Sequence, residues 1–225
     1  MKKTKLITII LCIVCLVSFT GCAGVLLSSM NGDSDFTSGI NAYEGGRYEE
    51  ALEYLKEAER KGLKEYEYGD LYAVFGHCYV EIQNMDKAFE YYNKALDEDP
   101  DSVEYLTNIA VAYRKNGDFN KAKELYSKAL EIDPDYPELN VSLGAIYVWE
   151  NDPETAIYYL DRAIELDPSI SVAYANASVA YAMAGDFETA REYLGQAIVL
   201  GYDKADLLEE RIDELENYEQ PNSKR

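Results

Sequence analysis

The sequence predicts an all-α fold of about five helical hairpins and one final helix. Proline recurs every 34 residues, at Pro100, Pro134 and Pro168. Alanine recurs at the same period, at Ala88, Ala122, Ala156 and Ala190. Each period holds two apolar stripes at helical spacing, separated by a short polar turn. One hairpin cannot bury its apolar faces alone, so the hairpins are expected to stack into a solenoid over residues 35–204 with a continuous core.

The first two repeats are expected at residues 32–68 and 69–102. The first contains GINAYEGGRYEEALEYLKEAERKGL and departs most from the pattern. It also has three extra residues, because Ala51 and Ala88 are 37 positions apart. In the second repeat, Pro100 follows the second helix; it lacks a backbone donor and so turns the chain into the next repeat.

The third repeat, residues 103–136, shows the expected hairpin clearly. One face of its first helix carries Leu106, Ile109, Ala110 and Tyr113. One face of its second helix carries Phe119, Ala122, Tyr126 and Ala129. The turn Asn116-Gly117-Asp118 lies between them. Both stripes follow the spacing of one helix face, which predicts that they pack together.

The last repeats are expected at residues 137–170 and 171–204, the latter with Tyr202 in place of the proline. Residues 205–218 are expected to form a capping helix. Leu208, Ile212 and Leu215 would cover the end of the core while acidic side chains face water. Residues 219–225 are expected to be a disordered tail.

These spacings resemble the tetratricopeptide repeat over about residues 32 to 204. The small or glycine position of that family falls on Gly39, Gly76, Ala110, Gly144 and Ser178. The resemblance implies a right-handed α-solenoid that acts as a protein-protein interaction scaffold and is not an enzyme.

Residues 1–21 resemble a bacterial lipoprotein signal peptide. MKKTK is followed by the apolar stretch LITIILCIVCLVSF and by Gly21 and Cys22. The resemblance implies that Cys22 becomes the first residue of the mature chain and carries lipid, including acyl groups such as palmitate. Residues 22–34 would then form the lipidated cysteine and its spacer.

The alternative is an uncleaved membrane anchor, because residues 23–27 could extend the apolar stretch to the length that a membrane helix needs. Lys2, Lys3 and Lys5 hold the N-terminus in the cytoplasm in either case. Both interpretations therefore place the body on the extracytoplasmic side of the bacterial cell membrane, within the cell envelope.

Composition argues against several function classes. The chain has 42 acidic and 21 basic residues, a net charge of −21, which repels nucleic acid. His77 is the only histidine, and no GxSxG, HExxH or P-loop pattern occurs. We therefore expect no metal, no cofactor and no catalytic residue. Cys78 is expected to be a small buried apolar residue.

A second stripe on the first helix of each repeat faces the concave groove in this family. We call its selected members the groove stripe: Phe36, Ile40, Tyr43, His77, Val80, Val111, Arg114, Lys115, Val141, Val148, Trp149, Val179 and Met183. Some of its valines are expected merely to pack between helices.

The groove stripe suggests a peptide-binding surface. Trp149, the only tryptophan, would anchor an extended or helical segment of a partner protein, and Arg114 and Lys115 would hold an acidic group. The alternative is a surface that binds glycan or peptidoglycan, with Trp149 and Tyr43 stacked on sugar rings.

Overall fold

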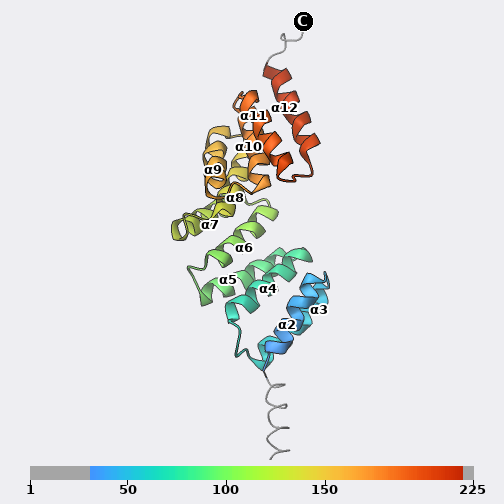
Figure 1. The fold of residues 1–225 in the computed structure, drawn as a ribbon. Coiled ribbons are helices and arrows are strands. Elements are labelled where there is room, and N and C mark those ends of the chain that lie inside the picture. The colour runs from blue at the N-terminus through green and yellow to red at the C-terminus, as the bar shows by residue number, and fades with distance from the viewer. Residues whose placement is uncertain (1–30, 220–225) are drawn as a thin grey trace, which may run out of the picture. The chain divides into compact units, whose positions relative to one another are not determined.

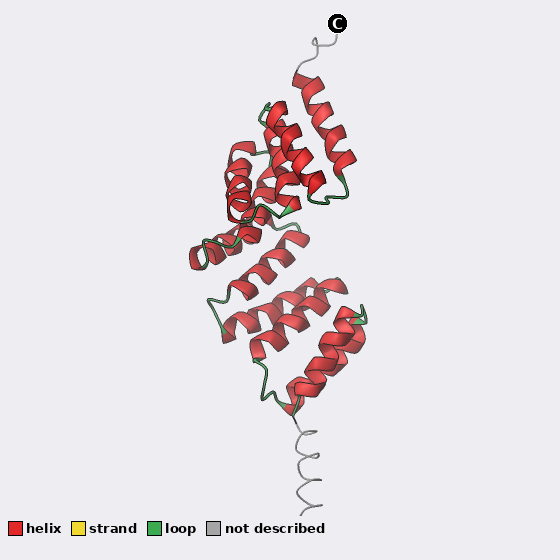
Figure 2. Cartoon of the chain, viewed as in Figure 1, coloured by secondary structure: helices red, strands yellow, loops and turns green. Residues whose placement is uncertain are grey.

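The computed structural model describes residues 31–219, which form eleven helices and contain no strand (Figures 1 and 2). The predicted all-α fold is therefore confirmed. The predicted signal peptide, Cys22, most of its spacer and residues 220–225 lie outside the described residues. No helix within residues 31–219 is both long enough and apolar enough to cross a membrane.

The described chain forms two compact units, residues 31–100 and residues 101–219. The first unit contains α2 (Asp33–Glu44), α3 (Tyr48–Lys61), α4 (Tyr68–Glu81) and α5 (Met85–Glu98). The second unit contains α6 (Val103–Lys115), α7 (Phe119–Ile132), α8 (Pro137–Trp149), α9 (Pro153–Leu166), α10 (Ser171–Met183), α11 (Phe187–Val199) and α12 (Ala205–Glu219). Consecutive helices pack as the hairpins α2–α3, α4–α5, α6–α7, α8–α9 and α10–α11, and α12 packs on α10 and α11. Continuity of the core from one compact unit to the other stays a prediction.

The turn inside each hairpin is built in the same way. One turn residue has a positive φ, and this position is taken by Gly46, Gln83, Gly117, Asn151 and Gly185. From the second hairpin on, the next residue caps the second helix: Asn84, Asp118, Asp152 and Asp186 accept backbone N–H groups at 3.0–3.2 Å. Such caps satisfy donors that a helix start leaves free.

In the repeats where the recurring small residue of the first helix is glycine, it lies against a large residue of the second helix. A Cβ atom at Gly76 would lie 2.5 Å from ring atoms of Tyr92, and one at Gly144 would lie 2.5 Å from Cγ of Leu160. Tyr92 and Leu160 are both almost fully buried. The repeat therefore needs a small side chain here, because the two helices meet at this point.

Asp33 explains how the longer first repeat is accommodated. The connection between α3 and α4 spans residues 62–67, and Oδ1 of the buried Asp33 accepts the backbone N–H groups of Lys64 and Glu65 at 3.0 and 3.3 Å. In the same connection, the ring of Tyr66 lies 5.0 Å from that of Phe36. The extra residues thus pack against the start of α2.

The last helix caps the second compact unit as the sequence predicts. Ile212 is buried against α11, and Leu208 and Leu215 pack around the same cluster. Arg191 of α11 bonds to Asp213 and Glu216 of α12 at 2.8 Å each. Apolar burial and paired charges therefore both hold α12 in place.

Candidate functional site

The groove stripe is divided between the two compact units. Its members in the first unit are Phe36, Ile40, Tyr43, His77 and Val80. Its members in the second unit are Val111, Arg114, Lys115, Val141, Val148, Trp149, Val179 and Met183. Each group is a separate candidate surface.

Two members of the groove stripe are buried, Phe36 against the prediction and Val141 as one of the valines that pack between helices. Phe36 is 2% exposed and Val141 is 8% exposed, so neither offers surface to a ligand. Both occupy the fifth position of their repeat, where Ala73 and Ala175 are also buried. Val141 packs against Ala163 and against α10, which shows that this position lies between helices.

In the first compact unit, aromatic residues surround His77. Its Nδ1 lies 2.9 Å from the hydroxyl of Tyr92. The ring of Tyr43 lies 5.9 Å from the His77 ring and 5.7 Å from that of Tyr48. Burial, followed by the nearby Glu81 carboxylate, raises the pKa of Tyr43. The same surface includes the half-buried Ile40 and Val80. This arrangement is a packed polar cluster, and His77 serves as a hydrogen-bonding partner in it.

In the second compact unit, Trp149 is strongly exposed. It is 68% exposed at the end of α8, and its ring stacks on that of Phe119 at 4.1 Å and 28°. Phe119 is the first residue of α7 and holds one face of the indole, while most of the Trp149 side chain remains open to solvent. Sequence reasoning assigned Phe119 to the hairpin core and missed this contact.

Two basic residues lie in the last turn of α6. Arg114 and Lys115 are both exposed, and residues 116–118 alone separate them from the start of α7 at Phe119. The stacking of Trp149 on Phe119 therefore places the indole ring at the end of the α6–α7 hairpin that carries Arg114 and Lys115. Val111, Val148, Val179 and Met183 are half-buried.

The second compact unit also contains a cavity that the sequence analysis did not predict. It has a volume of about 310 Å³ and is lined by Leu130, Pro134, Asn140, Tyr158, Tyr159 and Arg162. Tyr158 is 69% exposed and its ring meets that of Tyr159 edge-on at 5.1 Å. Its outward position on α9 is not part of the groove pattern, so the groove stripe could not include it.

Cys78 is fully buried in the first unit's core, as predicted. Burial raises the pKa of its thiol to about 12, so it remains a neutral thiol at physiological pH. Among residues 31–219, no cluster of three or more His, Cys, Asp or Glu side chains could hold a metal ion.

Family models match a continuous part of the chain. Three models described as tetratricopeptide repeat cover residues 36–103, 103–136 and 137–170. Together they span residues 36–170, more than half of the chain, and agree with the observed hairpins.

Curated relatives match over a shorter part. Photosystem I assembly protein Ycf3 of Cyanophora paradoxa is 38% identical over 85 residues, which are 37% of this chain and 48% of that protein. The Ycf3 of Prochlorococcus marinus strain MED4 is 31% identical over 84 residues, which are 37% of this chain and 49% of the relative. The chain thus spans about half the length of the curated relatives it matches.

Solved structures match most of the chain in fold. PilF of Pseudomonas aeruginosa aligns with a TM-score of 0.71 at 18% identity, over 85% of this chain and 93% of that one. A crystal structure of MamA aligns with a TM-score of 0.62 at 19% identity, over 78% of this chain and 94% of that one. A thermophilic tetratricopeptide-repeat protein of Thermus thermophilus aligns with a TM-score of 0.60 at 17% identity, over 82% and 98% respectively. At these identities the likeness concerns the fold.

Proposed function

Because the chain belongs to the tetratricopeptide-repeat family, we propose that it is a non-enzymatic scaffold that binds a protein or peptide segment through its second compact unit. The single observation that carries this proposal is Trp149, which is 68% exposed and stacked on Phe119. Exposing a large aromatic ring to water is unfavourable, and tryptophan dominates the energetics of many protein interfaces. The stack fixes the orientation of the ring before a partner arrives, which lowers the entropic cost of binding.

The surroundings of Trp149 define the chemistry of the partner. An apolar side chain of the partner would cover the open part of the indole. Arg114 and Lys115, at the end of α6, would attract an acidic group of the same segment. We therefore propose an apolar–acidic segment as the ligand.

The relatives support a role in assembly. The curated relatives named above are photosystem I assembly proteins. We infer that this chain likewise brings protein components together, with its own partner determined by the side chains around Trp149.

A matched pair of substitutions tests the binding surface. Trp149→Ala and Arg114→Glu should each weaken capture of the partner, Trp149→Ala by a factor of about thirty or more, which corresponds to the loss of a large interface anchor. Tyr218→Ala, which removes an aromatic side chain that is 87% exposed on α12, is the control and should bind normally. Normal capture by both Trp149→Ala and Arg114→Glu would contradict the proposal.

We also propose that Cys22 carries a lipid and that the scaffold works on the extracytoplasmic side of a bacterial membrane. The support is the order of charged, apolar and small residues that ends in Gly21 and Cys22. Intact-mass measurement of membrane-extracted protein should give a chain that starts at Cys22 with added lipid. A mass that includes Met1 and no lipid would contradict this proposal.

Glycan binding is the second candidate, and the cavity beside Tyr158 is the observation that favours it. An exposed tyrosine ring can stack on a sugar, and Asn140 and Arg162 line the same cavity. Binding of peptidoglycan fragments that is lost on Tyr158→Ala and retained on Trp149→Ala would support this alternative. No binding of such fragments would exclude it.

A further inference from the structure

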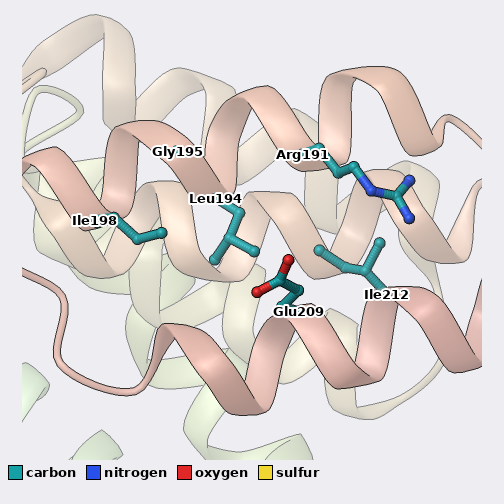
Figure 3. A pocket seen from close by; sticks show the side chains of 6 residues that line it. All are labelled: Arg191, Leu194, Gly195, Ile198, Glu209 and Ile212. Atoms are coloured by element: carbon teal, nitrogen blue, oxygen red, sulfur yellow. The ribbon is translucent and has the colours of Figure 1, made fainter.

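A second cavity lies between α11 and α12, away from the surface around Trp149. Its volume is about 170 Å³, and it is lined by Arg191, Leu194, Gly195, Ile198, Glu209 and Ile212. Figure 3 shows Leu194 of α11 pointing toward α12, and Glu209 and Ile212 of α12 pointing toward α11. An aliphatic cavity of about 150 Å³ can hold a benzene molecule. This cavity can therefore accept one large apolar side chain.

Gly195 is the unusual member of the cavity lining. It lies inside α11, where glycine is less stable than alanine. A Cβ atom added there would meet nothing within 4 Å, and its φ is not in the left-handed region. Neither packing nor backbone conformation in this chain therefore requires glycine.

The equivalent position in the other repeats carries a side chain. These residues are Lys56, Asn93, Ser127 and Asp161. Only the last repeat has glycine here, and only its second helix faces α12. The absence of a side chain at Gly195 leaves open space beside the cavity between the two helices.

Apolar surface continues around the opening of the cavity. Ile198 is 53% exposed, Val199 is 79% exposed and Leu207 is 64% exposed. These residues come from the end of α11 and the start of α12. A partner segment could therefore bury apolar surface on both sides of the cavity.

The charge around the cavity is acidic. Acidic residues on α12 include Asp206, Glu209, Glu210, Asp213, Glu214 and Glu216. Arg191 is already bound by Asp213 and Glu216, whereas Glu209 forms no ion pair with any residue in the part of the chain that the structure describes. The carboxylate of Glu209 is thus available to a cation beside the apolar space.

We propose that this cavity docks a peptide segment that carries one large apolar side chain next to a lysine or arginine. The apolar side chain lies beside Leu194 and Ile198, in the space that Gly195 leaves, and the cation pairs with Glu209. A second copy of this chain fits poorly, because it would bring the same acidic helix to the contact. This docking surface is separate from Trp149 and goes beyond the function proposed above.

Selection from a random-peptide phage library on the full chain tests the proposal. Peptides that also bind Gly195→Leu are removed, because the leucine fills the cavity from a position where a Cβ meets no neighbour. We expect enriched peptides to share a large apolar residue flanked by Lys or Arg. Their affinity should fall at least about tenfold on Gly195→Leu, as expected when an anchor pocket is filled.

Further variants separate the parts of the site. Gly195→Ala adds one methyl group, so it should raise the melting temperature and retain binding, which shows that loss in Gly195→Leu comes from the filled cavity. Glu209→Gln should weaken binding and reduce its salt dependence. Trp149→Ala should leave this binding unchanged, so the proposal can fail independently of the function proposed above.

Three results would overturn the proposal. The first is the absence of any peptide that distinguishes wild type from Gly195→Leu. The second is enrichment of peptides without a basic residue. The third is a wild-type dimer in sedimentation that Gly195→Leu converts to a monomer, because the occupant would then be a second copy of the chain.

Discussion

The α4–α5 and α6–α7 hairpins both have a buried tyrosine at the same repeat position, but the surroundings of its hydroxyl group differ. Tyr92 and Tyr126 are 34 residues apart and both are buried. The hydroxyl of Tyr92 lies 2.9 Å from Nδ1 of His77. The hydroxyl of Tyr126 has no partner among the described residues, and Val111 occupies the position equivalent to His77. The repeat therefore positions the ring, whereas a groove-stripe residue that varies between repeats decides whether the hydroxyl is satisfied.

The same two hairpins differ at two further positions. Gly76 in α4 corresponds to Ala110 in α6, so the larger of the two residues lies in the hairpin with Tyr126. Gln83 takes the positive-φ turn position at 61°, where the next repeat has Gly117 at 83°. In the α4–α5 hairpin the tyrosine hydroxyl has a partner, but the turn residue is glutamine in a left-handed conformation. In the α6–α7 hairpin the hydroxyl has no partner among the described residues, but the turn residue is glycine.

Of the changes considered, raising the pH should lower the free energy of unfolding the most. Burial raises the pKa of Cys78 and of Tyr91 to about 12, and it also raises the pKa of Tyr92. The unfolded chain loses these protons from about pH 9 to 10, so the folded state binds more protons above that range. The free energy of unfolding should be constant below about pH 9 and fall as the pH rises toward 12. Urea denaturation followed by circular dichroism measures it.

The control for this prediction is Cys78→Ala. It removes the group with the lowest unfolded-state pKa, so the loss of stability should begin nearer pH 10. Equal stability at about pH 8 and pH 11 would contradict the prediction that these groups are buried as neutral acids.

Gly76→Ala should have the next largest effect. The added Cβ would lie 2.5 Å from the Tyr92 ring, so the helices must separate, at a cost of about 2 kcal/mol in the free energy of unfolding. The matched variant Ala110→Gly should cost about 1 kcal/mol through helix propensity. A Gly76→Ala protein as stable as wild type in urea would show that α4 and α5 can move apart freely.

Removing the two hydroxyl groups should change stability in opposite directions. Tyr92→Phe should lower the free energy of unfolding by about 1 kcal/mol, because it breaks a hydrogen bond. Tyr126→Phe should raise it by about 1 kcal/mol, because it removes a buried polar atom without a partner. Val111→His should abolish the gain from Tyr126→Phe by supplying a partner. If Tyr92→Phe and Tyr126→Phe both raised or both lowered the free energy of unfolding, the two hydroxyl groups would not differ as described.

The smallest effect is expected in the turn. Gln83→Gly should stabilise the chain by about 0.5–1 kcal/mol, because a left-handed backbone conformation is unfavourable for glutamine. Gly117→Gln should cost a similar amount. Thermal unfolding of both variants measures these changes, and a loss of stability in Gln83→Gly would mean that its side chain contributes a contact that outweighs the backbone strain.

The fold could be predicted from the sequence because the spacing of apolar residues in each repeat reflects how its two helices pack together. Helix pairs, small contact positions and the capping role of Ile212 all follow from apolar spacing, which is a property of each repeat. The role of Asp33 was not predicted, because its partners lie in the connection 62–67, which is longer than the equivalent connections of the other repeats. The missing partner of the Tyr126 hydroxyl could not be predicted, because it depends on which residue stands at position 111. The core stripe contains only Tyr126 and the groove stripe only Val111, so neither pattern alone shows the pair.

The candidate site was predicted less completely. The exposure of Trp149 follows from its place outside the core stripe, but its contact with Phe119 depends on how α8 packs beside α7. The groove pattern could not tell which of its positions are covered, whereas in the structure Phe36 and Val141 lie near helix starts and are buried there. Position within the repeat predicts which face a residue occupies, but the depth of burial depends on the neighbouring hairpin.

Photo-crosslinking in living cells from a probe at position 149 tests the proposed scaffold most directly. A probe at position 218 is the control, because Tyr218 is 87% exposed on α12. We predict that mass spectrometry finds one recurrent protein crosslinked at position 149 and absent from position 218. The same material at both positions, or none above background at position 149, would contradict a protein-binding surface at Trp149.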